Sequence, residues 1–277
     1  AILLGDGEDA IVEIAACVRD ARSVGASREN ILLALSRIQG VYVPSLYDVV
    51  VDSTSTRWGY AVPKPGSGAP EVVLKRCVAD FASTPACAEH IVPYMGIVQD
   101  RLAIEVLRGC ARGCRFCQAG MTYRPVRERP MDQVVEASER GLAETGYDEL
   151  SLTSLSTTDH SQCAPMLNEL DERLSGRGIR VSIPSQRLDS FGVDMANAAS
   201  GSKRGGLTFA PEAGTQRLRD VINKNVTEED LERAARNAFE HGWRRVKLYF
   251  MMGLPTETDE DILAIPAATH RVLEIGR

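Results

Sequence analysis

The second part of the chain alternates between short apolar runs and longer stretches in which apolar residues recur with helical spacing. The apolar runs span 102–107, 149–153, 179–183, 206–209 and 245–250. The helical stretches lie near 131–145, 160–175, 189–200, 227–241 and 258–275. Short apolar runs separated by amphipathic segments predict strands joined by helices, and that order is typical of a parallel sheet.

Repeated βα units of this length predict an α/β fold, and more specifically a partial parallel βα barrel. A complete barrel of eight units takes about 250 residues, or roughly 31 residues per unit. Residues 102–277 are enough for between five and six units, and the sequence stops in or just after the fifth helix. We therefore expect an incomplete barrel that lacks its last strand, and a chain truncated at this end.

The first hundred residues have a different pattern. An apolar run at 2–4 predicts a strand, and helical spacing follows over 9–24 and again from Ser27, a good N-cap, to about residue 38. Short strands are expected at 49–52 and 71–75, and residues 78–95 are expected to be irregular. The Pro-rich and Gly-rich segment between these strands predicts a turn or linker.

Composition and charge exclude several classes of protein. The 277 residues are 44% hydrophobic and 25% charged, as in globular proteins and unlike disordered chains. A formal net charge of -6 argues against a broad electrostatic footprint for nucleic acid. No apolar run approaches the roughly 20 residues that span a bilayer, and the start has no basic segment of a signal peptide. We therefore expect a cytoplasmic protein with no membrane partner.

The cysteines point to a metal centre. Their number is seven, which is odd, and this argues against a disulfide framework. Cys110, Cys114 and Cys117 form a Cys-x3-Cys-x2-Cys motif directly after the strand predicted at 102–107. Three thiolates this close favour an iron–sulfur cluster, with one coordination position left open for a small molecule. Two alternatives stay open: a zinc site, which would need a fourth ligand, and a thiol–disulfide pair at Cys114 and Cys117.

This motif, with an aromatic residue before its last cysteine, resembles the radical SAM superfamily. A closer resemblance, to cobalamin-binding-like radical SAM proteins, is carried by EVLRGCARGCRFCQAGMTYRPVRERP, SLTSLSTTDHS, LTFAPEAGTQRLRDVINKNVTEEDL and VKLYFMMGLPTETDEDI. The opening ILLGDGEDAI is similar to the end of the Rossmann-like domain that precedes such barrels, so we expect truncation at this end as well. The resemblance implies three parts: a remnant of that domain with helices in 1–40, a linker region with short strands in 41–95, and a partial radical SAM barrel in 96–277.

The resemblance also implies an activity. Cys110, Cys114 and Cys117 would hold a 4Fe–4S cluster, and its fourth iron would bind S-adenosylmethionine. An electron from a reductant such as flavodoxin or ferredoxin would cleave this cofactor to a 5′-deoxyadenosyl radical, which abstracts hydrogen from an unknown substrate. Cobalamin use stays undecided, because the part of the family's domain that would carry its ligating His is not in the sequence. One alternative is a methylthiotransferase-like modification of RNA or protein, and another is a non-catalytic zinc-binding or cluster-binding interaction module.

Three residues near the first two strands are carried over as contacts of S-adenosylmethionine. Phe116 would lie beside the adenine. Ser154 and Ser156 would meet the methionyl amine, although the acidic residue usual at this place is absent. The structural alternatives are a packing role for Phe116 and capping roles for the serines.

Four further contacts follow the later strands. Arg187 would bind a carboxylate, and Glu212 would accept hydrogen bonds from ribose hydroxyls. Gly253 and Pro255 resemble the turn that flanks the adenine. Ion pairing of Arg187 with Asp189 or Glu212 is the structural alternative. All of these residues follow predicted strands, and barrel active sites are built at the C-terminal ends of strands.

Arginines are concentrated around the cysteine motif. Six of them lie close together: Arg108, Arg112, Arg115, Arg124, Arg127 and Arg129. They could recognise an anionic substrate, RNA included, or they could balance an anionic cluster and pair with Glu128 and its neighbours. Because the whole chain is acidic, the second interpretation is favoured.

Overall fold

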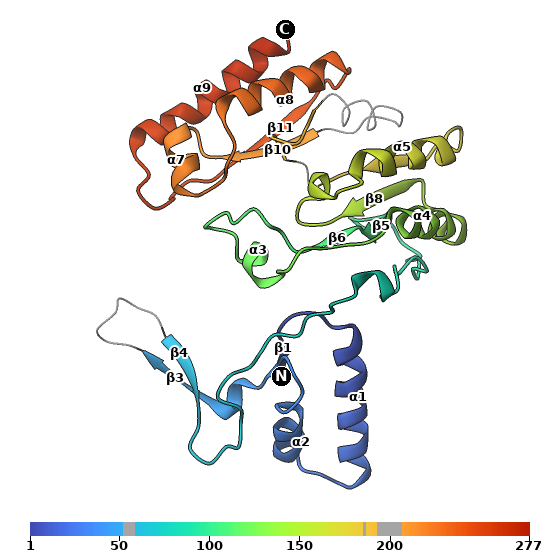
Figure 1. Ribbon diagram of the computed structural model, residues 1–277, viewed down its shortest axis with the longest axis vertical. Coiled ribbons are helices and arrows are strands. Elements are labelled where there is room, and N and C mark those ends of the chain that lie inside the picture. The colour runs from blue at the N-terminus through green and yellow to red at the C-terminus, as the bar shows by residue number, and fades with distance from the viewer. Residues whose placement is uncertain (52–58, 185–186, 193–206) are drawn as a thin grey trace. The chain divides into compact units, whose positions relative to one another are not determined.

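The computed structural model describes residues 1–51, 59–184, 187–192 and 207–277. The chain divides into two compact units, Ala1–Asp80 and Phe81–Arg277 (Figure 1). Within the described ranges, none of the helices combines the length and the apolar character that a membrane span requires.

The first unit contains two helices beside a pair of short strands. Strand β1 (Ile2–Leu3) pairs antiparallel with β2 (Val41–Tyr42), and between them lie α1 (Glu8–Ser23) and α2 (Arg28–Leu35). Ser27 caps α2 as predicted, because its Oγ accepts a hydrogen bond from the backbone N–H of Asn30. A 3-10 turn, η1 (Pro44–Leu46), follows β2. The small core of this unit is built on Leu35, Val41 and Val43.

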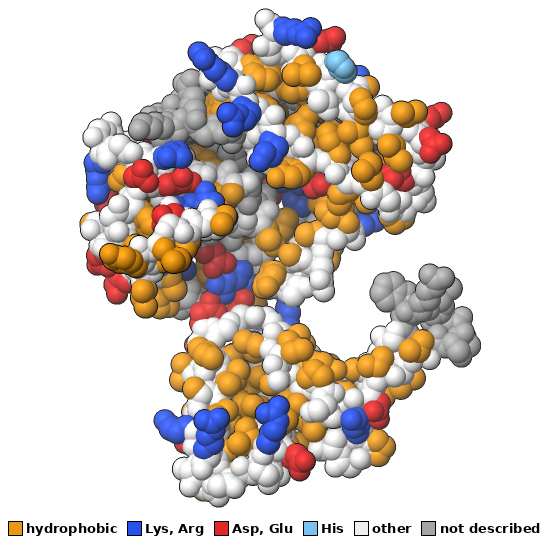
Figure 2. Space-filling view, turned by 180° about the vertical axis from the view of Figure 1, so that it is seen from behind, with side chains coloured by type: hydrophobic (Ala, Val, Ile, Leu, Met, Phe, Trp, Pro, Cys, Tyr) orange, Lys and Arg blue, Asp and Glu red, His pale blue; other side chains and the backbone are white. Residues whose placement is uncertain are grey.

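A β-hairpin completes the first unit. Strand β3 (Tyr47–Val51) pairs antiparallel with β4 (Gly59–Pro63). The prediction of a strand at 71–75 was wrong. These residues lie outside any strand, and the following residue, Arg76, forms an isolated β-bridge with Gly5. The partner of β3 is instead the segment closest to it along the chain, because closing a short hairpin costs less chain entropy. Many apolar side chains of this unit stay exposed, and Figure 2 shows them over much of its visible face.

The second unit is built on parallel strands at all five predicted positions. Strands β5 (Leu102–Glu105), β8 (Glu149–Thr153) and β9 (Arg180–Ser182) form one parallel sheet in the order β5-β8-β9. Strands β10 (Leu207–Glu212) and β11 (Val246–Phe250) form a parallel pair. The predicted α/β class, a partial parallel barrel, is confirmed.

Helices cover these strands (Figure 1). Helix α4 (Met131–Thr145) packs on β5 and on α5 (Cys163–Leu174), while α8 (Glu228–Glu240) packs on α9 (Asp259–Ile275). A capping box begins α8, in which Thr227 and Asp230 bond each other's backbone N–H groups. The helix predicted at 189–200 lies mostly outside the described residues.

A single core joins the two groups of strands. Leu102, Ile104, Leu150 and Leu152 of the first sheet are fully buried. Phe209 of β10 belongs to the same core, where it makes an edge contact with Phe191, with 5.3 Å between the ring centroids. Because the strands within each group are parallel, each group presents its C-terminal ends along one edge.

Candidate functional site

The cysteine motif lies in a loop whose two ends are pinned together. Strand β6 (Leu107–Arg108) pairs antiparallel with β7 (Arg127–Glu128), and the loop runs between them. Gly109 opens the loop with a φ of 88°, and a Cβ there would lie 2.6 Å from the carbonyl oxygens of Tyr123 and Pro125. Only glycine fits such an approach of backbone to backbone, so Gly109 closes the base of the loop.

The three cysteines are free thiols on this loop. Cys114 is buried, and Cys110 and Cys117 are partly exposed. Cys117 caps the short helix α3 (Gln118–Thr122), and its Sγ accepts a hydrogen bond of 3.2 Å from the backbone N–H of Gly120. A Cβ on Gly120 would lie 4.0 Å from Cβ of Cys110, so this residue is close to both ends of the motif.

These residues provide the donors that a 4Fe–4S cluster requires. Cysteine thiolates are the ligands of such clusters, and N–H donors to their sulfurs tune the cluster. Three free thiols on one loop, one of them already accepting an N–H, fit this chemistry. Among the described side chains, no group of three or more His, Cys, Asp or Glu converges closely enough to hold a single metal ion, whereas the thiolates of a four-iron cluster each bind a different iron.

The loop also docks on a segment that the sequence did not predict as an element. Short helix α7 (Gln216–Val221) starts at Thr215, whose side chain caps it. Just after α7, the carbonyl of Ile222 accepts a 2.9 Å hydrogen bond from Arg115 N–H, and Asn223 Nδ2 donates to the carbonyl of Gly113 at 2.8 Å. The segment after β10 therefore holds the cysteine loop from the side.

Lys224 brings two predicted site residues together. Its Nζ lies 3.2 Å from Oε1 of Glu212 and 5.9 Å from the ring centroid of Phe116. The lysine and glutamate side chains are only 12% and 15% exposed. Sequence reasoning missed Lys224, because its contacts are with residues remote along the chain. The available signal was the Asn-Lys-Asn sequence, whose two asparagines have positive φ.

Arg187 adopts the ion pair that was its structural alternative. The guanidinium binds both oxygens of Asp189, at 2.9 and 3.3 Å, and donates to the carbonyl of Lys224 at 3.1 Å. Of the two pairings considered, the structure has the one with Asp189, since Glu212 is paired with Lys224. The Arg187 side chain thus contacts the backbone of Lys224.

The segment after β8 holds a carboxylate that the sequence reading had missed. Asp159, in the 3-10 turn η3 (Thr157–Asp159), receives two hydrogen bonds from Arg112 of the cysteine loop. Arg112 also pairs with Asp189 at 3.1 Å. Burial alone would raise the pKa of Asp159, but the hydrogen bonds from Arg112 and Ser156 and the charges of Arg112 and Arg187 together lower that pKa. The hydrogen bond to Asp159 raises the pKa of Arg112.

The two predicted serines differ in their surroundings. Ser154 Oγ bonds Thr157 Oγ1 at 2.8 Å and accepts the N–H of Ser156 at 3.0 Å, so it shapes the turn. Ser156 is 2% exposed, and its Oγ makes no geometrically sound hydrogen bond within the part of the chain that is described. It is close enough to Asp159 to help lower the pKa of that carboxyl. Ser156 therefore has a buried hydroxyl beside the Asp159 carboxylate.

Gly253 and Pro255 lie in an exposed turn after β11. Gly253 has a φ of 83° and donates its N–H to Glu257 Oε2 at 2.6 Å. Leu254 between them packs toward a cluster of Ala213, Leu218 and Ile222. The turn is therefore anchored on the segment that carries α7.

Each arginine around the motif is bound within the protein. Arg108 pairs with Glu105, and Arg112 with Asp159 and Asp189. The others donate to backbone carbonyls, of Val221 for Arg115, Cys110 for Arg124, Tyr123 and Pro125 for Arg127, and Thr84 and Glu105 for Arg129. Glu128, an expected partner, instead accepts hydrogen bonds from Ser161. The arginines thus serve mainly to fix the loop.

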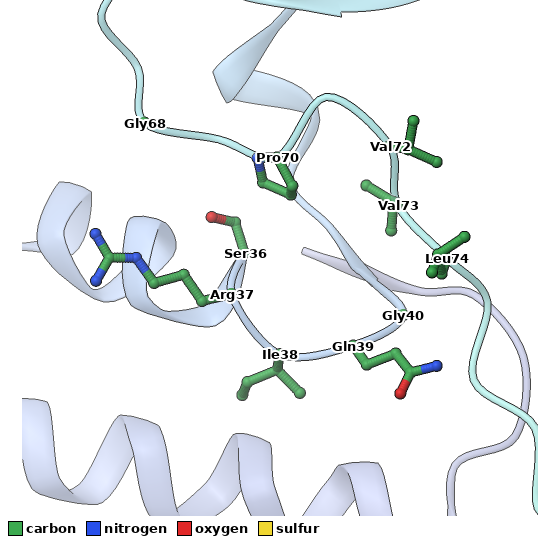
Figure 3. Close-up of a pocket in the computed structure, with 10 residues that line it drawn as sticks. All are labelled: Ser36, Arg37, Ile38, Gln39, Gly40, Gly68, Pro70, Val72, Val73 and Leu74. Carbon is green, nitrogen blue, oxygen red and sulfur yellow. The ribbon is translucent and has the colours of Figure 1, made fainter.

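The first unit has a cavity of about 370 Å³ between residues 36–40 and 68–74 (Figure 3). Val72, Val73 and Leu74 line one side, and Ser36 and Gln39 belong to the other. The hydroxyl of Ser36 is bound to the carbonyl of Leu33, and Figure 3 shows Arg37 directed away from the valines. This lining offers few groups for catalysis, and the cysteine loop stays the stronger candidate.

Parts of this chain are similar in sequence to known proteins. An uncharacterized protein of Methanocaldococcus jannaschii is 38% identical over 169 residues, which are 61% of this chain and 36% of the relative. A tRNA-2-methylthio-N(6)-dimethylallyladenosine synthase of Petrotoga mobilis is 24% identical over 194 residues, 66% of this chain and 44% of the relative. The chain thus spans less than half the length of these curated relatives.

Solved structures agree with the fold. The radical S-adenosylmethionine methyltransferase TsrM from Kitasatospora setae matches 94% of this chain and 48% of its own, with a TM-score of 0.58 and 17% identity. The cobalamin-dependent S-adenosylmethionine radical enzyme OxsB matches 91% of this chain and 34% of its own, with a TM-score of 0.57 and 14% identity.

The match to a family model assigns the chain to a protein family. The model of the radical SAM superfamily matches residues 104–265, more than half of the chain, and this range contains the cysteine loop and strands β8 to β11. The chain therefore belongs to the radical SAM superfamily, a family of enzymes that use a 4Fe–4S cluster and S-adenosylmethionine.

Proposed function

We propose that Cys110, Cys114 and Cys117 hold the 4Fe–4S cluster of this enzyme. The observation that carries the proposal is the loop itself: three free thiols, closed at the base by Gly109 and docked on residues 222–223. Held by these cysteines and reduced by an external donor, the cluster would supply the electron that cleaves S-adenosylmethionine to methionine and a 5′-deoxyadenosyl radical able to abstract hydrogen from a substrate.

The residues around Lys224 are proposed to position S-adenosylmethionine. Phe116 offers a ring face to the adenine, and Glu212 can accept hydrogen bonds from ribose hydroxyls. Lys224 carries a largely shielded side chain whose ammonium suits a carboxylate, and Arg187 supports it by donating to the Lys224 carbonyl. We propose that Arg187 acts on the carboxylate in this indirect way, because Asp189 already occupies much of its guanidinium.

The remaining predicted contacts have weaker structural support. Ser156 is the better candidate of the two serines for the methionyl amine, because its buried hydroxyl is available while Ser154 holds the turn. Gly253 and Pro255 stay proposed for the adenine edge, on the basis of their place after β11 and the anchoring of Leu254.

We also propose a redox partner and a second cofactor for the whole protein. A one-electron donor such as flavodoxin or ferredoxin has to reduce the cluster, and a cytoplasmic location suits such chemistry because thiols stay reduced there. Cobalamin is a candidate second cofactor, supported by the solved structures of TsrM and OxsB, which contain it.

Methylthio transfer is the second candidate function. It is supported by the 24% identity with a tRNA-2-methylthio-N(6)-dimethylallyladenosine synthase. The arginines of the cysteine loop add little support for RNA, because all six are bound within the protein. An RNA or other anionic substrate would therefore have to be held elsewhere.

Anaerobic reconstitution tests the proposal. The protein is loaded with iron and sulfide, both are quantified, and S-adenosylmethionine is added with a strong reductant. We expect about four irons per chain and production of 5′-deoxyadenosine. Stoichiometric zinc without iron uptake, or a reversible Cys114–Cys117 disulfide without iron, would refute the cluster assignment.

A further inference from the structure

Arg112 connects the cysteine loop to two other strand ends. It lies between Cys110 and Cys114 in the motif. Its Nε donates to Asp159 Oδ2 at 2.9 Å, its Nη2 donates to the other oxygen of Asp159, and its Nη1 lies 3.1 Å from Asp189 Oδ2. Asp159 follows β8, and Asp189 comes after β9. One side chain therefore ties the motif to the C-terminal ends of two strands.

The charges of this group cancel. Two arginines and two aspartates alternate along it, since Asp189 pairs with Arg187 as well as with Arg112. Their side chains are between 9% and 33% exposed, so water screens them incompletely. We call Arg112, Asp159, Asp189 and Arg187 the loop network. The neighbouring Lys224–Glu212 pair is also neutral.

Resting on the proposed cluster at the three cysteines, we propose that the charge of Arg112 tunes the reduction potential of that cluster by offsetting the charges of Asp159 and Asp189. Reduction adds a negative charge to the cluster, and a nearby cation stabilises the reduced state, whereas an anion destabilises it. In the intact loop network the two effects balance. Removing one member unbalances them in a direction that depends on which member is removed.

The sign of the shift separates this role from a merely structural one. Without the Arg112 cation, the network keeps two carboxylates and one arginine, so the midpoint potential falls. Without the Asp159 anion, it keeps two arginines and one carboxylate, so the potential rises. Both changes break the same ion pair. If that pair only held the loop in place, the two variants would disturb the cluster in the same way.

The experiment compares the reconstituted full chain with Arg112→Met, Arg112→Lys, Asp159→Asn and Asp189→Asn. Arg173→Met is the matched control, because Arg173 also bridges two carboxylates, Glu169 at 2.7 Å and Glu139 at 2.9 Å, but does so on the outer surface of α5. Iron and sulfide are quantified first. The midpoint potential is then measured without S-adenosylmethionine, by a redox titration followed by electron paramagnetic resonance.

We expect a more negative potential for Arg112→Met and a more positive one for both aspartate variants. Arg112→Lys, which keeps the charge, should stay near the parent, as should the Arg173 control. Shifts of equal sign in Arg112→Met and Asp159→Asn, or no shift in either, would overturn the inference. If Arg112→Met binds no iron, the two aspartate variants test the inference by themselves. An unchanged or more negative midpoint potential in both of them would also overturn it. A parent protein that takes up no iron would overturn the proposed function, and this inference with it.

Discussion

Replacing Gly109 by alanine should open the base of the cysteine loop. The new Cβ would lie 2.6 Å from two carbonyl oxygens, those of Tyr123 and Pro125. Both are backbone atoms, so no side chain can rotate away to make room. The φ of 88° is itself unfavourable for an L-residue. Both effects act on the same residue, and both oppose the observed pairing of β6 with β7.

The magnitude follows from these two contributions. A non-glycine residue at positive φ costs about 1 to 2 kcal/mol. Forcing extra volume into a packed place costs about 1 to 3 kcal/mol more. We therefore expect Gly109→Ala to lower the free energy of unfolding by about 2 to 5 kcal/mol. The three cysteines, which all lie between this base and α3, should then lose their placement, so iron uptake should fall as well.

Alanine substitutions at two other glycines separate the cost of positive φ from the cost of the steric clash. Gly113 has a φ of 76°, and a Cβ there would meet only side-chain nitrogens, at 3.4 Å. Gly146, which ends α4, has a φ of 72° and would meet no described atom within 4 Å. Alanine at either position should show the conformational cost alone. Urea unfolding of the metal-free variants measures stability, and iron per chain after reconstitution measures the loop. Equal losses of stability and iron for Gly109→Ala and Gly146→Ala would refute the argument.

Three further outcomes are expected. Alanine at Cys110, Cys114 or Cys117 should abolish iron uptake. Cys163→Ala should leave iron uptake unchanged, because burial in α5 raises the pKa of the Cys163 thiol to about 12 and so disfavours the thiolate that binds iron. Lys224→Met and Glu212→Gln should weaken S-adenosylmethionine binding about 10- to 150-fold in titrations of cluster-loaded protein, the equivalent of a lost charged hydrogen bond, while Lys247→Met should not. Asp230 should stabilise α8 by about 1 kcal/mol above pH 4. Burial opposes ionisation of this carboxyl, but hydrogen bonds from Thr227 and Arg233 lower its pKa below the ordinary 3.8. Its stabilising contribution is therefore lost as the pH falls through the lowered pKa, and acid unfolding of Asp230→Asn should lack this loss.

The strands and long helices were predictable because their signals are local. Ser27 and Thr227 cap the helices that follow them through hydrogen bonds spanning three residues, so the sequence around each contains the whole interaction. The apolar runs of β8 and β11 are bounded by polar turns, and their positions were predicted within a residue. Short elements gave no such signal: α3 has five residues and α7 has six, too few for a repeating helical pattern.

Pairing between distant segments was the part that could not be predicted. An apolar run at 71–75 has the composition of a strand, but the sequence does not say which segment will pair with β3. The same holds in the site. Phe116 and Glu212 were expected near the same strand ends, but their contacts with Lys224 depend on the docking of the cysteine loop on residues 222–223.

The arginines of the cysteine motif show why charge in a sequence is weak evidence for a binding partner. A guanidinium has five donors and binds equally well to a phosphate, a carboxylate or a backbone carbonyl. Here the last two kinds of acceptor are close at hand, because the folded loop and the segments after β8 and β10 present carbonyls and carboxylates to these side chains. Arg124 and Arg127 bind carbonyls of the loop itself, and Arg115 binds one from α7. A cation already satisfied within the protein must break those bonds before it can bind a polyanion, and the loop would lose its support in doing so. The same arginines that stabilise a cluster loop are therefore poorly suited to recognise RNA.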